Sequence, residues 1–417
     1  MRGSRLLIIV SAGLVSACGN YTSATRQARD EFYAGKYTDA AKLLEKGAHE
    51  DSLNQLLFLF DRATALHEAG DYEESIKDFA RADKLAEIKD YTSLAAEAAT
   101  LVSTDRIIPY KGEDFEKVLI SQYLALNYLM LHKYEDALVE CRRVNHKLHM
   151  MISQGKRKYK LNPFASYISA LMYEDQKEWN DAYVDYQAVQ KLAPEFAYLG
   201  QDLYRLAWRN NIRDDMERWA NEYHLSSDDR KRIRDEAKLP ELVVIVESGK
   251  SPEKEPHPSW SALPHYVPRY NPVAYSQVLV DGKEVGRSQS LFNVEATAIQ
   301  NLDDKFAGIL AKHIAGVVAK EVVADQVGKR TDPIVGAILR LGLYAVDQAD
   351  LRSWLTLPKD FQLFRARVQP GASYKLQIKP KDASGGDVGT PSGVIEKIVH
   401  FEKDKPDQRV FVHVRAL

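Results

Sequence analysis

A short segment recurs four times in the first half of the sequence, and this repeat limits the fold more than any other feature. Residues 34–44 and 69–79 align at an offset of 35 residues, and 132–141 and 177–186 are further copies. Each copy has an aromatic residue followed three positions later by a small one: Tyr37 and Ala40, Tyr72 and Ser75, Tyr134 and Ala137, Trp179 and Ala182. Such a period is typical of stacked helix pairs, in which each pair buries its apolar face against its neighbours. The sequence therefore predicts a helical repeat array.

The helix before each copy carries a second regular pattern. Ala63, Ala125 and Ala170 supply small residues at which paired helices can pack closely. Together with the aromatic positions, they resemble the tetratricopeptide repeat. We expect the array to span residues 26–239, with a degenerate fifth pair in 197–223 and a polar capping helix in 226–239.

The resemblance also predicts a binding surface. A tetratricopeptide array presents a concave groove lined mainly by the first helix of each pair. The repeat frame places eight residues on this groove: Phe60, Thr64, His67, Gln122, Leu126, Tyr167, Leu171 and Glu174. We expect them to contact a protein partner, and the alternative is that they pack against the rest of the chain.

The N-terminus has the pattern of a bacterial lipoprotein signal. Two arginines precede an apolar run at 6–15, and small residues lie immediately before Cys18. We expect residues 1–17 to be a signal peptide, Cys18 to be lipidated, and 18–25 to be a short tether. Gly19 in place of an aspartate favours the periplasmic face of the outer membrane, by the usual sorting rule of Gram-negative bacteria.

Composition limits the remaining function classes. The formal net charge is -2, so a nucleic acid is not an expected partner. Hydrophobic residues make up 45% and charged residues 28% of the chain, which is typical of a globular protein. Because Cys18 is assigned to the lipid, Cys141 has no partner for a disulfide within the chain, and we expect a buried, inert thiol.

The pattern changes from helical to extended at Pro240. A β-branched run at 242–246 predicts a buried strand, and 251–272 contains six prolines, so 240–274 is expected to be a strand followed by a linker. We expect a hairpin with one strand on each side of the Asp281-Gly282 turn. Further strands are expected at 361–368 and at 374–378. The segments 394–401 and 409–415 are expected to form a terminal pair of strands.

The expected fold is thus a multidomain α+β protein, with an α-helical tetratricopeptide-like superhelix followed by a β-rich, sandwich-like domain. Residues 275–417 form that domain, and Gly/Ala-rich helices within 294–350 form a helical insertion in it. The helices at 306–346 could pack in a soluble core or touch a membrane. Lys312 and Lys320 are among the charges that favour the soluble alternative.

Three segments carry a more specific resemblance. Residues 112–145, 242–254 and 349–358 are similar to an uncharacterised family of tetratricopeptide-repeat lipoproteins from Gram-negative bacteria. The resemblance implies the architecture and a role in envelope biogenesis, and it implies no activity. Within the first segment, Glu113 and Glu116 are expected to pair with Arg142 and Arg143, or alternatively to form a charged binding site.

The sequence lacks the common motifs of catalytic and nucleotide-binding sites. It contains no phosphate-binding loop, nucleophile elbow or His-Glu-x-x-His pair. His146 and His149 could share a metal, but no further ligand is suitably spaced, so neither a metal nor a cofactor is expected. The expected function is a scaffold or adaptor for another envelope protein. The alternatives are a hydrolase and a peptidoglycan- or glycan-binding protein that would use four aromatic residues: Trp260, Tyr266, Tyr270 and Tyr275.

Overall fold

The computed structural model describes residues 21–100, 109–155, 162–330 and 349–417, apart from 390, 392 and 406. Cys18, the signal peptide and most of the second Gly/Ala-rich helix lie outside these residues. The helices are α2 (Tyr21–Ala24), α3 (Arg26–Tyr33), α4 (Tyr37–His49), α5 (Gln55–Ala69), α6 (Tyr72–Thr100), α7 (Asp114–Met130), α8 (Tyr134–Gly155), α9 (Pro163–Asp175), α10 (Trp179–Leu192), α11 (Leu199–Arg209), α12 (Arg213–Glu222), α13 (Ser227–Glu236) and α14 (Val294–Arg330). The strands are β1 (Glu241–Ser248), β2 (Glu253–His257), β3 (Trp260–Val267), β4 (Tyr275–Val280), β5 (Lys283–Arg287), β6 (Gln289–Asn293), β7 (Asp360–Arg367), β8 (Ser373–Lys381), β9 (Ile395–His400) and β10 (Arg409–Ala416).

The helices α3 to α12 form the predicted array of pairs, and one turn geometry recurs between paired helices. A residue with positive φ lies in each turn: Gly35, Gly70, His132, Lys177 and Asn211. The next residue donates its backbone N–H to the carbonyl five residues earlier, which closes the first helix of the pair. The second helices α4, α6, α8 and α10 then begin at the repeated aromatic residue. The repeat frame, the fifth pair α11–α12 and the capping helix α13 are therefore confirmed.

Small residues allow the helices of each pair to approach closely. Ala63, Ala125 and Ala170 are at most 3% exposed. Cys141 is buried in the same core, as predicted, and burial raises the pKa of its thiol.

The strands form two four-stranded sheets and a separate hairpin. One sheet has the order β10-β1-β7-β6, in which β1 pairs in parallel with β10 and antiparallel with β7. The other sheet has the order β5-β4-β8-β9 and is antiparallel. Apolar side chains from both sheets share one core, so the sandwich-like expectation is confirmed.

Strand β1 explains why the sequence shows a continuous apolar run. Leu242, Val244 and Val246 pack into the core between the two sheets. Val243 and Ile245 point the other way and join the core of the helical array. Every residue of β1 is buried, because one of its faces contacts the second sheet and the other contacts helices.

Several predicted boundaries differ from the structure. The proline-rich segment expected to be a linker contains the hairpin β2–β3. The last two strands lie in different sheets, with β9 beside β8 and β10 beside β1. The expected tether contains helix α2, whose Tyr21 is buried and donates a hydrogen bond to Asp61 at 2.5 Å.

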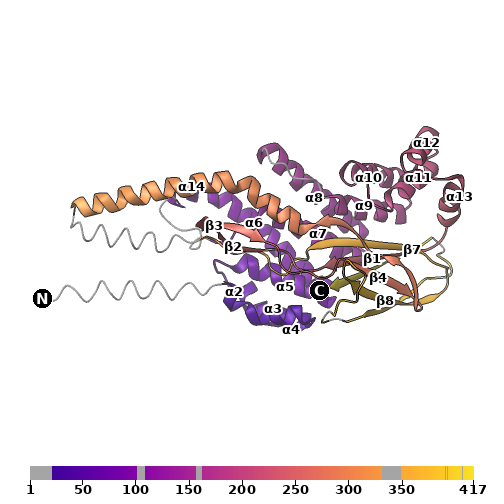
Figure 1. Cartoon of the computed structure of the whole chain (residues 1–417), viewed down its shortest axis with the longest axis horizontal. Helices are drawn as coiled ribbons and strands as arrows, with labels where there is room; N and C mark the ends of the chain where they lie inside the picture. Colours follow the sequence, from indigo (N-terminus) through magenta and orange to yellow (C-terminus); the bar gives the residue numbers. More distant parts are fainter. Residues whose placement is uncertain are drawn as a thin grey trace.

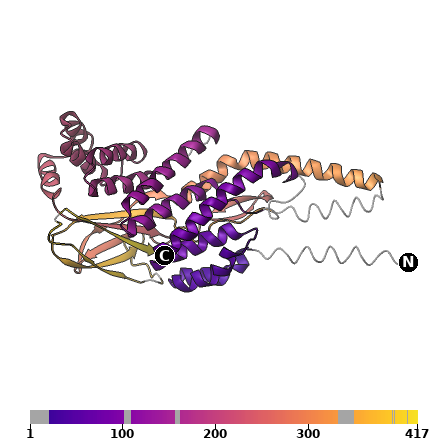
Figure 2. The ribbon, with the colours of Figure 1, turned by 180° about the vertical axis from the view of Figure 1, so that it is seen from behind.

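The helical insertion begins with the long helix α14. Figures 1 and 2 show that α14 runs along the hairpin β2–β3 and then projects beyond the rest of the described structure. The exposed side chains of α14 include Ile314, Val318 and Val322. Among the described helices, none combines the length and apolarity needed to cross a bilayer.

A glycine-to-alanine pair tests the packing of the array. A Cβ at Gly47 of α4 would lie 2.4 Å from the ring of Phe58, which itself packs edge-on against Tyr21. We expect Gly47→Ala to lower the free energy of unfolding by about 1–3 kcal/mol, because the ring must move. Gly308→Ala on α14 meets no atom within 4 Å and serves as the control.

Urea titration followed by circular dichroism would measure both variants. Gly308→Ala should unfold at the wild-type midpoint or above it, since alanine favours a helix. Equal midpoints for Gly47→Ala and the wild type would show that α4 and α5 are not packed as described.

Candidate functional site

The concave face of the helical array is covered by later parts of the same chain. Side chains of α5, α7, α9 and α11 contact the sheet β10-β1-β7-β6, and the segment around Trp354 contacts α5 and α7. All eight residues predicted to line an open groove are buried, the most exposed being Glu174 at 7%. The expectation of an open groove is thus corrected, and the alternative, that these residues pack against the rest of the chain, is the one observed.

Most of the predicted groove residues contact the C-terminal half directly. Phe60 and Thr64 contact Trp354, and His67 contacts His413. Tyr167 accepts a hydrogen bond from Arg365, while the Leu171 carbonyl and the Glu174 carboxylate face Arg409. Gln122 accepts a hydrogen bond from Asn162, and Leu126 lies in the shared apolar core.

Trp354 fills the middle of the concave face. Its ring stacks on Phe60 with the centroids 4.4 Å apart, and its Nε1 donates to Thr64 Oγ1 at 3.0 Å. The backbone N–H of Trp354 donates to Glu116 Oε1 at 2.7 Å, and Thr356 Oγ1 donates to Asp61 Oδ1 at 2.8 Å. The segment around Trp354 therefore occupies the surface on which such arrays hold an extended ligand.

A network of paired charges joins the sheet to α9 and α11. Glu241 of β1 accepts hydrogen bonds from Arg365 Nε at 2.7 Å and Arg409 Nε at 2.8 Å. Arg365 also pairs with Asp202 of α11 at 2.6 Å and donates to the Tyr167 hydroxyl. The four charged side chains are at most 5% exposed. Buried charges of this kind are stable only when they are paired.

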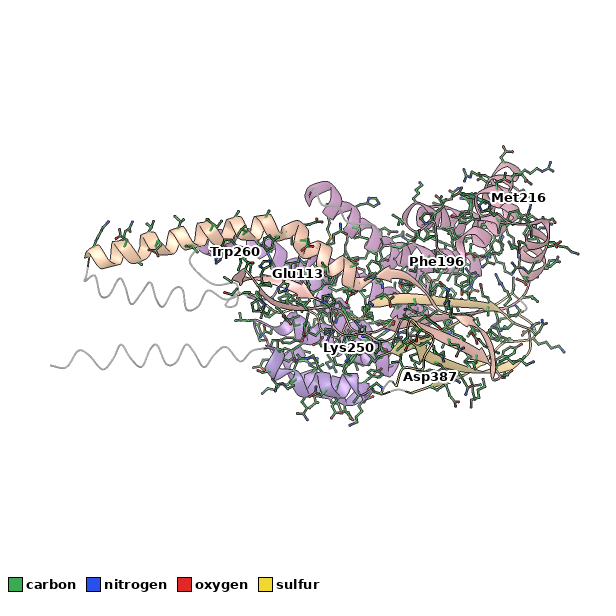
Figure 3. The ribbon with its side chains drawn as sticks, viewed as in Figure 1. Glu113, Phe196, Met216, Lys250, Trp260 and Asp387 are labelled. Atoms are coloured by element: carbon green, nitrogen blue, oxygen red, sulfur yellow. The ribbon has the colours of Figure 1, made fainter. Side chains whose placement is uncertain are left out.

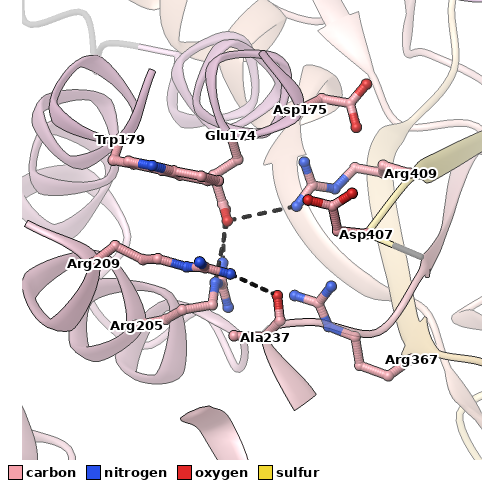
Figure 4. A pocket seen from close by; sticks show the side chains of 9 residues that line it. All are labelled: Glu174, Asp175, Trp179, Arg205, Arg209, Ala237, Arg367, Asp407 and Arg409. Carbon is pink, nitrogen blue, oxygen red and sulfur yellow. Dashed lines mark hydrogen bonds and ion pairs between the residues drawn. The ribbon is translucent and has the colours of Figure 1, made fainter. Parts of the chain in front are cut away.

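Glu174 extends this charge network to a small polar cavity. Its carboxylate lies 2.6 Å from Arg205 and 3.6 Å from Arg409. Burial alone would raise the pKa of Glu174, but the two guanidinium groups outweigh burial and lower the pKa to about 2. Figure 4 shows the residues that line the cavity: Glu174, Asp175, Trp179, Arg205, Arg209, Ala237, Arg367, Asp407 and Arg409. Arg205, Arg367 and Arg409 pair with carboxylates of the same chain, and Arg209 donates to the Ala237 carbonyl, so the cavity has the character of a structural ion network.

A second buried cluster contains the residue types that bind metals. His67 and Glu68 come from α5, Glu247 from β1 and His413 from β10. One potential ligand atom from each lies within 4.8 Å of all the others. Burial lowers the pKa of His413 to about 4, and burial together with Glu247 raises the pKa of Glu68 well above its usual range. Arg415 pairs with Glu247 at 2.8 Å.

A third charge cluster corrects the expected pairing of Glu113 and Glu116. Glu113 pairs with Lys254 of β2 at 2.5 Å and with Lys305 of α14 at 3.0 Å. Glu116 accepts from the Tyr110 hydroxyl at 2.6 Å. Figure 3 shows Glu113 beside α14. The two glutamates thus hold the hairpin and the segment around Trp354 in place.

The arginines expected opposite these glutamates have other partners. Arg143 pairs with Asp83 of α6 and with Glu140 at 3.0 Å, and Arg142 donates to the Tyr173 hydroxyl at 3.1 Å. Both arginines connect neighbouring helices of the array. His146 and His149, which were considered as metal ligands, are exposed on α8 and belong to no described metal-binding group.

Sequence reasoning missed the charged residues on the strands. Glu241 and Glu247 flank the apolar run of β1, and both lie on the face that carries Val243 and Ile245. On β10, polar residues of the same face alternate with residues of the opposite face: Arg409, His413 and Arg415. This period of two was a readable signal that the face toward the helices is charged.

The four aromatic residues considered for glycan binding differ in their exposure to solvent. Tyr266 is 7% exposed and packs against Phe115, so it is not a surface residue. Trp260 and Tyr270 are 49% and 87% exposed. Figure 3 shows Trp260 near α14.

Comparison with known proteins assigns no family to the chain. No protein-family model matches the sequence, and no curated protein matches it. A solved structure of MamA from Desulfovibrio magneticus RS-1 is 16% identical, with a TM-score of 0.33, and covers 51% of this chain and 97% of its own. A tetratricopeptide repeat protein from Parabacteroides merdae is 14% identical, with a TM-score of 0.33, and covers 51% of this chain and 70% of its own.

Glu174→Gln tests the network between sheet and array. We expect this variant to lose about 3 kcal/mol of stability at pH 7, because two buried arginines lose a charged partner. The folded-state pKa of about 2 lies below the usual 4.5, so the carboxylate contributes fully above pH 4.5 and progressively less as the pH falls toward 2. The stability difference between wild type and variant should therefore shrink over that window.

Urea unfolding at a series of pH values would measure this difference. Glu135→Gln, at an exposed position on α8, is the matched control and should stay close to wild type at every pH. A constant difference for Glu174→Gln between pH 7 and pH 2 would contradict the described pairing.

Proposed function

We propose that the protein is a lipid-anchored adaptor of the Gram-negative cell envelope, which binds another envelope protein and acts by binding rather than by catalysis. The observation that carries this proposal is the helical repeat array, an architecture built to present extended binding surfaces. The lipoprotein pattern that ends at Cys18 supports the membrane anchor.

The surface offered to a partner is the outer face of the array. Because the concave face is filled by Trp354 and the sheet, a partner would have to contact the second helices of the pairs. Leu43 of α4, Val139 of α8 and Val184 of α10 are 46%, 46% and 54% exposed. They supply apolar contact points along the outer face.

The buried position of Tyr21 limits the distance between the first repeats and a membrane to which Cys18 would be anchored. Tyr21 is buried, and its hydroxyl donates to Asp61 and to the Leu57 carbonyl of α5. Only three residue steps separate Tyr21 from Cys18, and an extended chain of that length spans about 10 Å. With Cys18 acylated, the first repeats would lie directly on the bilayer surface.

Cys18→Ser tests the anchor. We expect the wild type to incorporate radiolabelled palmitate and to fractionate with membranes, and the variant to lose both properties because the acylated thiol is gone. Cys141→Ser, which changes the buried thiol instead, should keep the label and the membrane fractionation. Unchanged processing and fractionation of Cys18→Ser would overturn the proposed anchor.

Site-specific photocrosslinking in living cells tests the binding surface. A photoreactive residue at Val139 or Val184 should give a discrete adduct with an envelope protein, identified by mass spectrometry. The matched control is Ile398, which is 81% exposed on β9, the edge strand of the sheet β5-β4-β8-β9. Adducts of equal yield from Ile398, or none from either helix position, would contradict the assignment of the outer face.

A further inference from the structure

We propose that His67, Glu68, Glu247 and His413 form a structural zinc site that fastens the sheet into the helical array. The central observation is a triangle of potential ligand atoms. His67 Nε2, His413 Nε2 and Glu247 Oε1 are each 3.2 Å from the other two. Ligands about 2.0 Å from a tetrahedral Zn²⁺ ion are about 3.3 Å apart, which matches this triangle.

The tautomer of His67 is fixed by a chain of hydrogen bonds. Ser75 Oγ donates to the Ala63 carbonyl at 2.8 Å, so it accepts from Asn127 Nδ2 at 2.9 Å. Asn127 therefore turns its Oδ1 toward His67 Nδ1, 2.6 Å away, and Nδ1 must carry the proton. Neutral His67 then presents the lone pair of Nε2 to the triangle. Metal-binding histidines typically have such an outer hydrogen bond.

Glu247 is oriented in the same manner. Its Oε2 accepts from the Tyr123 hydroxyl at 2.7 Å and from Arg415 at 2.8 Å. Its Oε1 is left facing the two histidines. The carboxylate is thus held as a one-oxygen ligand, and the groups that hold it are fully buried.

Glu68 supplies the fourth ligand. Its Oε2 lies 3.9 Å from His413 Nε2, and its Oε1 lies 3.4 Å from Arg415. Two imidazole nitrogens and two carboxylate oxygens suit Zn²⁺, whereas Ca²⁺ and Mg²⁺ prefer oxygen ligands alone. Four protein ligands leave no open position, so the site is structural rather than catalytic.

The surroundings of the cluster also suit a bound cation. The two carboxylates lie on side chains that are at most 1% exposed, so bulk water does not reach the space between them and the imidazoles. The two Nε2 atoms lie 3.2 Å apart and can share one proton between them, whereas a bound Zn²⁺ would use the lone pair of each.

The metal content of the full-length protein, purified in detergent without a histidine tag, tests the proposal. Inductively coupled plasma mass spectrometry should find one zinc per chain. The double variant His67→Gln/His413→Gln should lose the zinc, while His146→Gln/His149→Gln, which changes two exposed histidines, should keep it. Zinc retained in the first double variant would overturn the site.

A second measurement does not depend on the variants folding. Wild-type protein refolded with Zn²⁺ should melt about 5 °C or more above protein refolded with a chelator. Protein refolded with Co²⁺ should show the intense visible absorption bands of tetrahedral cobalt. No zinc in the purified wild type, with no thermal shift and no such bands after refolding, would overturn the site. Because these readouts need no partner, the zinc site can fail while the adaptor function stands, and the reverse also holds.

Discussion

The pairing of buried charges between the sheet and the helical array is the constraint on which the rest of the structure depends. Glu241 and Glu247 of β1 lie on the face that meets the helices, and each is compensated by arginines of the neighbouring strands. Isolated charges at this depth would cost several kcal/mol each, so the strands and helices can be buried together only in one register. The array and the sheet therefore behave as a single unit.

In this arrangement, the concave face of the array contacts the rest of the chain. In this chain, that face is filled by Trp354, which stacks on Phe60, and by the charged face of the sheet. The C-terminal half thus packs on the concave face of the array, and the outer helices remain accessible to other molecules. A metal at His67 and His413 would bind the two halves through coordination as well as through ion pairs.

Local features of the fold were readable from the sequence, and long-range pairings were not. The aromatic residues Tyr37, Tyr72 and Tyr134 marked the starts of second helices, because turn geometry and helix packing are set within one repeat. The seating of β7 and β10 against α9 and α11 joins residues more than a hundred positions apart, as in the contact of Asp202 with Arg365. Periodicity carries no information on such contacts, so the sequence placed the groove residues on the array but could not decide between a partner and the rest of the chain as the group that covers them.

The parallel pairing of β1 with β10 has a consequence for how the chain acquires its structure. Glu241 lies beside Arg409, so β1 gains its neighbour only after 168 further residues have been synthesised. Until then, the apolar strand β1 and its two glutamates lack their final contacts. Contacts between residues so far apart in the sequence form slowly.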